Sequence, residues 1–137
     1  MTKDLKCFDQ TGFTTLDMML SDRESGGYLA VAEWSERVSS SQIVRKKYPM
    51  EGGIQYMLIV ATEQKVDAVG IEVRDSHGTK LEYTHTINEL LKNQISLFYT
   101  PPYDDDYELS FRVVNSNKPL TCLYMAIMKG DPDPDAQ

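Results

Sequence analysis

Histidine and serine are the side chains of this sequence best suited to acid–base or nucleophilic chemistry at neutral pH. The two histidines are His77 and His85, and Ser76 directly precedes the first of them. The glycine flanks and strand–turn–helix context of a nucleophile elbow are missing around this serine. We therefore expect His77 to be solvated, His85 to lie at the surface or the core edge, and the chain not to be an enzyme.

Three consecutive aspartates, Asp104, Asp105 and Asp106, form the densest acidic cluster. Calcium takes about six to eight oxygen ligands from carboxylates and loop carbonyls. Asp67 or Asp75 would add to the cluster if the fold brought them to the same end. The spacing matches no defined calcium loop, so we favour a solvated turn and no cofactor. Calcium binding, or a small enzyme that uses the aspartates, is the alternative.

Four aromatic residues are candidates for ligand binding: Trp34, Tyr28, Tyr99 and Tyr103. Carbohydrate-binding sandwiches stack sugar rings on such side chains, which combine apolar contact with a polar rim. The competing interpretation, which we favour for Trp34, is that the indole fills the core. Its polar neighbours in the sequence leave both interpretations open.

The two cysteines, Cys7 and Cys122, are too few for a disulfide scaffold and wrongly spaced for a zinc site. Antiparallel sandwiches often bring their terminal segments together, and a bridge across so long a loop would stabilise the fold by roughly 4–5 kcal/mol. The alternative is a pair of unrelated thiols, with Cys122 buried as a small apolar residue.

Composition limits the classes of partner. The 137 residues carry a net charge of −7 and suffice for one core. Nucleic acids and anionic membranes require dense positive charge, so we expect neither as a partner. The sequence has no apolar run long enough to insert into a membrane, and its first residues do not form a signal peptide.

The segment Gly52–Gly78 organises the predicted fold. Residues 54–61 form a continuous apolar run, and Val69–Arg74 alternates apolar and polar residues, so we expect two strands paired as a central hairpin. Tyr107–Val113 shows the clearest alternation, and we expect its tyrosine, leucine, phenylalanine and valine to point inward. Further strands are expected at 28–38, 42–48, 79–87, 94–100 and 120–129, with one helical turn or a loop at 88–93.

These patterns predict an all-β fold: a single antiparallel β-sandwich, jelly-roll-like, with about eight strands and a short N-terminal helix. The helix is expected at Thr15–Glu24, capped by Thr14 and ended by Gly26 and Gly27. The lysine-rich strand at 42–48 is expected at a sheet edge and to end at Pro49. We expect an arm and helix over 1–27, the sandwich over 28–129 and a disordered acidic tail over 130–137.

Several short motifs resemble those of two related modules, the pre-peptidase C-terminal (PPC) domain and the GOLD domain. They are the glycine-led strand Gly53–Tyr56, Asp75-x-x-Gly78, Phe98-x-x-Pro101-Pro102 and the alternating strand Tyr107–Val113. The resemblance implies an appended, non-catalytic β-sandwich that binds polymers, proteins or lipids or assists secretion. The aspartates at 104–106 depart from it, because that position commonly holds a small residue and glycine.

We therefore expect a non-enzymatic binding or accessory module, outside the cytoplasm (periplasmic or secreted), that recognises a protein, glycan or envelope component. The alternative is a structural subunit that forms a homo-oligomer through its apolar strands, for which the apolar segment 120–129 would supply the interface. The sequence does not specify the oligomeric state.

Overall fold

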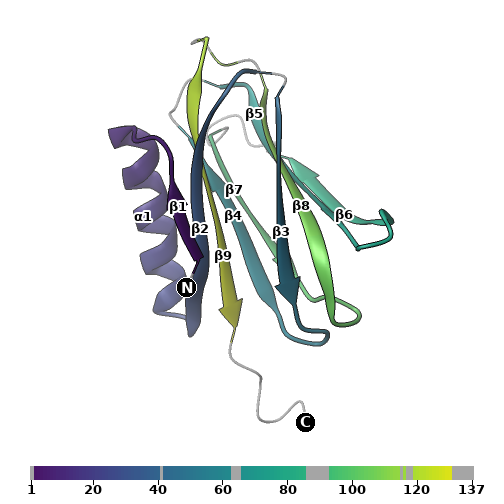
Figure 1. Cartoon of the computed structure of the whole chain (residues 1–137). Helices are drawn as coiled ribbons and strands as arrows, with labels where there is room; N and C mark the ends of the chain where they lie inside the picture. Colours follow the sequence, from purple (N-terminus) through teal and green to yellow (C-terminus); the bar gives the residue numbers. More distant parts are fainter. Residues whose placement is uncertain are drawn as a thin grey trace.

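The structure, a computed structural model, describes residues 2–40, 42–62, 66–85, 93–114, 116 and 119–130. These residues form two packed sheets and one helix, which lies against one of the sheets (Figure 1). The elements in chain order are β1 (Thr2–Leu5), α1 (Gln10–Glu24), β2 (Tyr28–Val38), β3 (Ile43–Met50), β4 (Tyr56–Ala61), β5 (Ala68–Arg74), β6 (Lys80–His85), β7 (Gln94–Tyr99), β8 (Asp105–Val114) and β9 (Thr121–Gly130).

The predicted sandwich is confirmed, and its strand order is that of a jelly roll. Sheet A has the order β1-β2-β9-β4-β7, and sheet B has the order β3-β8-β5-β6. Strands β2 to β9 are the expected eight, and their neighbours in each sheet are antiparallel. The ninth, β1, pairs parallel to β2 at the edge of sheet A. No sequence pattern predicted β1, because all four of its side chains are exposed and none has to follow a core pattern.

The predicted central hairpin is wrong, although both of its strands exist. β4 belongs to sheet A and pairs with β7 and β9, whereas β5 belongs to sheet B and pairs with β6 and β8. The chain between them crosses from one sheet to the other. Alternation in a sequence shows which face of a strand is buried, but it does not show which strand lies beside it.

The main core lies between the sheets, and β8 supplies one side of it as predicted. Tyr107, Leu109, Phe111 and Val113 are all fully buried. The inward residues of β5 face the same layer, since Ile71 pairs with Phe111 and both are fully buried. Side chains from β2, β4 and β9 close the core from sheet A.

The basic strand β3 is an edge strand, as expected from its lysines. It continues through Pro49 to Met50, two residues beyond the predicted end. Proline lacks a backbone donor, but an edge strand needs donors on one side only. The proline therefore ends no strand here.

Helix α1 packs on the outer face of sheet A, so that this sheet is covered on both sides. Leu16 and Leu20 are buried there, and Met19 packs beside them. The helix begins five residues before the predicted start, because Asp9 rather than Thr14 caps it: the Asp9 side chain accepts a hydrogen bond from the Gly12 amide. It ends at Glu24 as predicted. Among the described residues, no helix is long and apolar enough to span a membrane.

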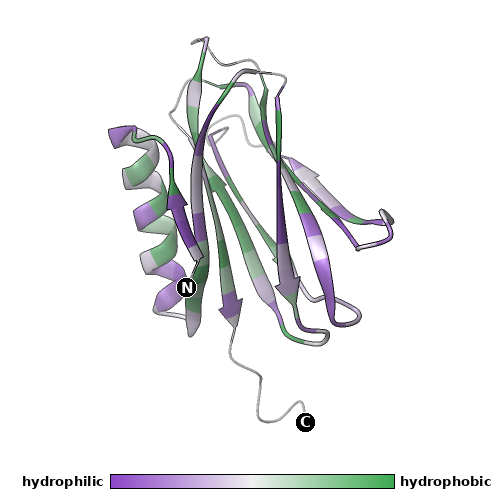
Figure 2. Cartoon of the chain, viewed as in Figure 1, coloured by the Kyte–Doolittle hydropathy of each residue, from purple (hydrophilic) through white to green (hydrophobic). Residues whose placement is uncertain are grey.

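The covered face explains the composition of the central strands. Every residue of β4 is buried, and so is every residue of β9 except Lys129. Figure 2 shows hydrophobic colour along most of both strands, whereas β3 is largely hydrophilic. Alternate residues of β4 and β9 face the main core, and the others face α1.

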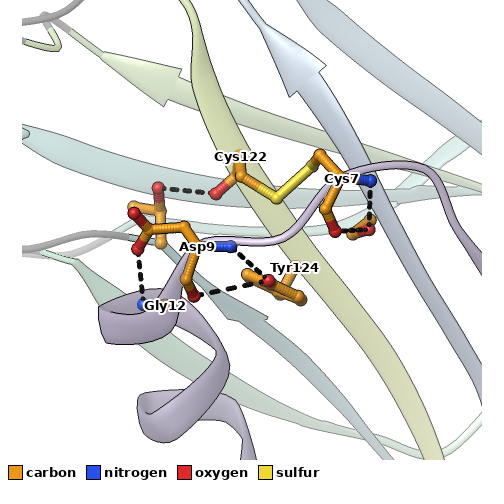
Figure 3. Close-up of a disulfide and its surroundings, with 7 residues drawn as sticks. Cys7, Asp9, Gly12, Cys122 and Tyr124 are labelled. Atoms are coloured by element: carbon orange, nitrogen blue, oxygen red, sulfur yellow. Dashed lines mark hydrogen bonds between the residues drawn. A yellow bond between two sulfur atoms is a disulfide. The ribbon is translucent and has the colours of Figure 1, made fainter.

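A disulfide between Cys7 and Cys122 joins the arm before α1 to β9, with the two Cα atoms 5.9 Å apart. Of the two interpretations of the cysteines, the bridge is therefore confirmed. Hydrogen bonds support it on both sides (Figure 3): the Asp9 amide donates to the Tyr124 hydroxyl at 2.8 Å, and the Cys7 amide donates to Ser35. Covalent and polar contacts thus hold the start of α1 against the middle of sheet A.

Truncating the core at Phe111 should destabilise the fold strongly. Phe111→Ala removes a fully buried ring from the centre of sheet B, so we expect the free energy of unfolding to fall by about 3–5 kcal/mol. Urea denaturation measures this loss. Phe98→Ala is the control, because Phe98 is 46% exposed and should cost much less. Equal losses would contradict the core assignment.

Reduction of the disulfide should also destabilise the protein. The bridge joins residues 115 positions apart, and closure of so long a loop corresponds to about 4–5 kcal/mol in the chain-entropy description. Urea unfolding with and without a thiol reductant should show most of this difference. The double variant Cys7→Ala, Cys122→Ala should be insensitive to reductant. A wild-type urea unfolding curve that reduction leaves unchanged would contradict the prediction.

Candidate binding surface

The outer face of sheet B is the sheet face that neither the core nor α1 covers in the described structure. The strand registers arrange its side chains in three rows that run across β3, β8, β5 and β6. The rows are Ile43, Arg112, Gly70, His85; then Arg45, Ser110, Glu72, Tyr83; then Lys47, Glu108, Arg74, Lys80. We call these twelve residues the outer face.

The outer face is more basic than the chain as a whole. It has five arginine or lysine side chains and two glutamates, whereas the chain carries a net charge of −7. Three of the cations are paired: Glu72 lies 2.9 Å from Arg74 and 3.6 Å from Lys80, and Glu108 lies 3.6 Å from Arg45. The hydrogen bond from Arg74 lowers the pKa of Glu72, which therefore stays ionised at neutral pH.

Arg112 is engaged by an aromatic side chain rather than by an acid. Its guanidinium donates to the Tyr83 hydroxyl at 2.6 Å and lies 5.7 Å from the centre of the Tyr83 ring. The Lys80 ammonium also lies over this ring, at 4.9 Å, and the His85 ring is 5.6 Å away. Within the described residues, Arg112 makes no ion pair with a carboxylate.

A small hollow opens on the outer face at Gly70. It has a volume of about 80 Å³. Its lining includes the side chains of Ile43, Arg112, Tyr83, Ser110 and Glu72. A β-carbon at residue 70 would stand at ordinary contact distance, 3.5 Å from Arg112 Nε and 3.4 Å from the Thr84 carbonyl, and would take up part of the hollow. We call this hollow the Gly70 notch.

The four aromatic candidates do not form one site. Trp34 is 5% exposed and Tyr99 is 7% exposed, and both belong to the main core. Tyr28 is partly buried on the helix side of sheet A, where its hydroxyl donates to Gln55 and its ring lies 6.1 Å from Phe98. These three side chains therefore offer no shared platform for a sugar.

Tyr103, the fourth candidate, is 43% exposed but is part of a hydrogen-bonded corner. Its hydroxyl donates to the Asp75 carboxylate at 2.5 Å, which raises the pKa of Tyr103 to about 12. Its ring stacks on Tyr107, whose hydroxyl donates to the Tyr103 carbonyl, and Tyr99 meets Tyr107 edge-on. Burial raises the pKa of Tyr99 to about 12 as well.

The aspartate run ties neighbouring loops together. The Asp104 carboxylate accepts the Gly52 amide at 2.7 Å, and the Asp105 carboxylate accepts the amides of Ser76 and Asp106, both at 2.9 Å. Asp106 itself is exposed. Among the described residues, no three histidine, cysteine or acidic side chains are placed to hold one metal ion.

The two additional aspartates considered for a metal site lie at opposite ends of β5. Asp67 precedes this strand, and Asp75 follows it. Asp75 is at the same end as Asp105, whose carboxylate bonds the amide next to it. Of the two alternatives, Asp75 therefore lies at the end of the aspartate run, and Asp67 does not, because the seven-residue strand β5 separates them.

The histidines and serine also lie apart. His77 and Ser76 are exposed in the turn after β5, and His85 lies on the outer face beside Tyr83. An unbroken alternation along the predicted strand at 79–87 would place Leu81 on the same face as Tyr83 and His85. The pairing of β5 with β6 is irregular at this point and passes over Leu81, which packs against the main core.

Sequence reasoning missed Arg112, Tyr83 and Gly70 as a group. The alternation of β8 did identify Arg112 as an outward residue, and that of β5 placed Gly70 outward. What the sequence lacked was the order β3-β8-β5-β6, which sets these residues side by side. A glycine at an outward position of a strand is the signal that could have pointed to a close approach.

No protein-family model matches this chain, and no curated protein sequence matches it.

The stability of the loop corner should depend on pH in the acid range. The Asp75 carboxylate accepts the Tyr103 hydroxyl and the amides of Thr79 and His77, and these bonds lower its pKa. A lowered pKa stabilises the fold above the unfolded value of about 3.9, and the contribution is lost as the pH falls through the folded value. Asp75→Asn should therefore cost stability at pH 6 and cost less at pH 2–3.

Urea unfolding across this pH range measures the effect. Tyr103→Phe removes the bond that lowers the pKa of Asp75 most, while Asp75 stays in place. The pKa of Asp75 should rise, so the stability that this carboxylate contributes should be lost at a higher pH than in the wild type. A constant difference between wild type and Asp75→Asn at all pH values would contradict this account.

Proposed function

We propose that this chain is a non-enzymatic binding module that meets its partner through the outer face of sheet B and acts outside the cytoplasm. The single observation that carries the proposal is the uncovered face itself. Its tyrosine, its three arginines and its notch are of the kind that concentrates binding energy at protein interfaces, where tyrosine and arginine are enriched.

The position of α1 supports this choice of face. In a two-sheet sandwich each sheet has one outer face, and here α1 occupies that of sheet A through Leu16 and Leu20. The strands with the most apolar sequences, β4 and β9, lie inside sheet A and contribute to both buried layers. A homo-oligomer built through these strands would first have to displace the helix.

The disulfide supports the proposed compartment. Structural disulfides persist in oxidising surroundings such as the periplasm or the cell exterior and are rare in the cytosol. The Cys7–Cys122 bridge holds α1 in place, so it has a structural role. The resemblance to PPC and GOLD modules, which are accessory sandwiches, agrees with a secreted or periplasmic binding role.

A site-specific photo-crosslinker tests the proposal. Placed at Ser110, in the middle of the outer face, it should capture a protein, glycan or envelope component from an envelope extract of the organism that makes the chain. The matched control carries the crosslinker at Met18, which is exposed on α1. We expect a discrete product from Ser110 and none from Met18.

Two other results would count against the proposal. Capture from Met18 alone would place the contact on α1. Crosslinks from Ser110 only to further copies of the chain, together with a concentration-independent oligomer by light scattering, would favour an assembly subunit.

A further inference from the structure

We infer that the Gly70 notch is a carboxylate-binding site and that its occupant is a glutamate or aspartate side chain of a partner protein. The inference rests on the proposed function, because it names the group that the outer face recognises. It is carried by three features of the notch: an arginine that pairs with no described carboxylate, a hollow that accommodates a carboxylate, and the charges around it.

Arg112 supplies the donor for an anion. An arginine has five N–H donors in a fixed fork that matches a carboxylate. One nitrogen of this fork, Nη2, donates to the Tyr83 hydroxyl, and no described carboxylate pairs with the guanidinium. The bond to Tyr83 fixes the orientation of the fork beside the notch. His85, on the other side of Gly70 in the same row, adds a second polar group that can donate.

The size of the notch suits a small group. Its volume of about 80 Å³ accommodates a carboxylate with its adjoining methylene. The absence of a side chain at residue 70 creates the room, and a methyl group there would occupy part of it.

The charges beyond Arg112 favour a protein over a polyanion. A nucleic acid or an acidic polysaccharide repeats its negative charge and requires an unbroken basic strip. Here two glutamates interrupt the basic side chains. Glu72 lines the notch and pairs with Arg74, and Glu108 lies two rows from the notch and pairs with Arg45. A mixed surface of this kind complements a partner that presents one carboxylate among neutral and apolar groups. Ile43, which is 41% exposed at the rim, offers such a partner an apolar contact.

Titration by NMR of the isotope-labelled full chain tests the inference. The probe is an extended pentapeptide with both ends blocked and a single central glutamate between threonine and valine residues. Its twin carries glutamine instead. We expect the glutamate peptide to shift the backbone amide signals of Gly70, Tyr83 and Arg112, and the glutamine twin to bind at least about tenfold more weakly, since a hydrogen bond to a charged group is lost.

Variants locate the effect. Arg112→Gln should weaken the glutamate peptide about tenfold, and Gly70→Ala should weaken it by partly filling the notch. Arg45→Gln is the matched control, because it removes the same charge from the next row, where Arg45 already pairs with Glu108, and should change binding less than twofold. Thermal unfolding of each variant confirms that the fold is kept. Equal affinity for both peptides, or equal losses from Arg112→Gln and Arg45→Gln, would overturn the carboxylate site.

Two further arms examine the source of the anion. Inorganic phosphate and a short uronic acid oligosaccharide are titrated under the same conditions. Shifts at Gly70 and Arg112 with either of these but not with the glutamate peptide would overturn the assignment to a protein side chain.

The outcome is distinguishable from that of the crosslinking experiment. Capture at Ser110 that is unaffected by Arg112→Gln, with no peptide binding, refutes the notch while leaving the proposed face intact. Peptide binding at the notch without any capture at Ser110 counts against the proposed partner contact while leaving the carboxylate site intact.

Discussion

The structure depends on one packing arrangement, the burial of sheet A on both sides. The strands β4 and β9 are apolar at nearly every position, and a sheet with such strands at its centre cannot leave either face in water. Sheet B covers one face, and the side chains of Leu16 and Leu20 cover the other. An isolated helix of this length is only marginally stable in water. Packing on sheet A therefore stabilises the helix, and the helix in turn keeps water from the apolar face of the sheet. The disulfide at Cys7 and the Asp9 contacts with Tyr124 fix the two together.

This arrangement divides the molecule into a structural side and a side free for recognition. The helix and the bridge occupy the outside of sheet A, and the loop corner around Asp75 and Tyr103 consists of bonds that hold turns in place. The outer face of sheet B carries its polar and aromatic groups on regular strands, which position side chains more rigidly than loops do. The proposed site is therefore built on the part of the sandwich with the best-defined geometry, and Arg112 is held by Tyr83 before any ligand arrives.

Much of the fold followed from the sequence because burial leaves a period in it. The alternation in β8 predicted the inward residues correctly, the charge of β3 predicted its edge position, and Gly26 and Gly27 predicted the end of α1 at Glu24. Strand pairing did not follow, since β4 and β5 are neighbours in sequence but belong to different sheets. The candidate surface was missed for the same reason: its residues come from four strands. The cap at Asp9 was missed because Thr14 also has a side chain suited to capping, and the sequence does not show which of the two is used.

The contact between Asp9 and Tyr124 also sets an order of events during synthesis. The two residues are separated by 115 positions, as are Cys7 and Cys122. The helix is synthesised before the three strands that it packs on, β2, β4 and β9, and β9 follows the other two. Contacts of such long sequence separation form slowly, because the loop between them has to close first. Residues 2–24 can therefore complete their packing only after β9 has been made, and until then the apolar side chains of the helix stay accessible.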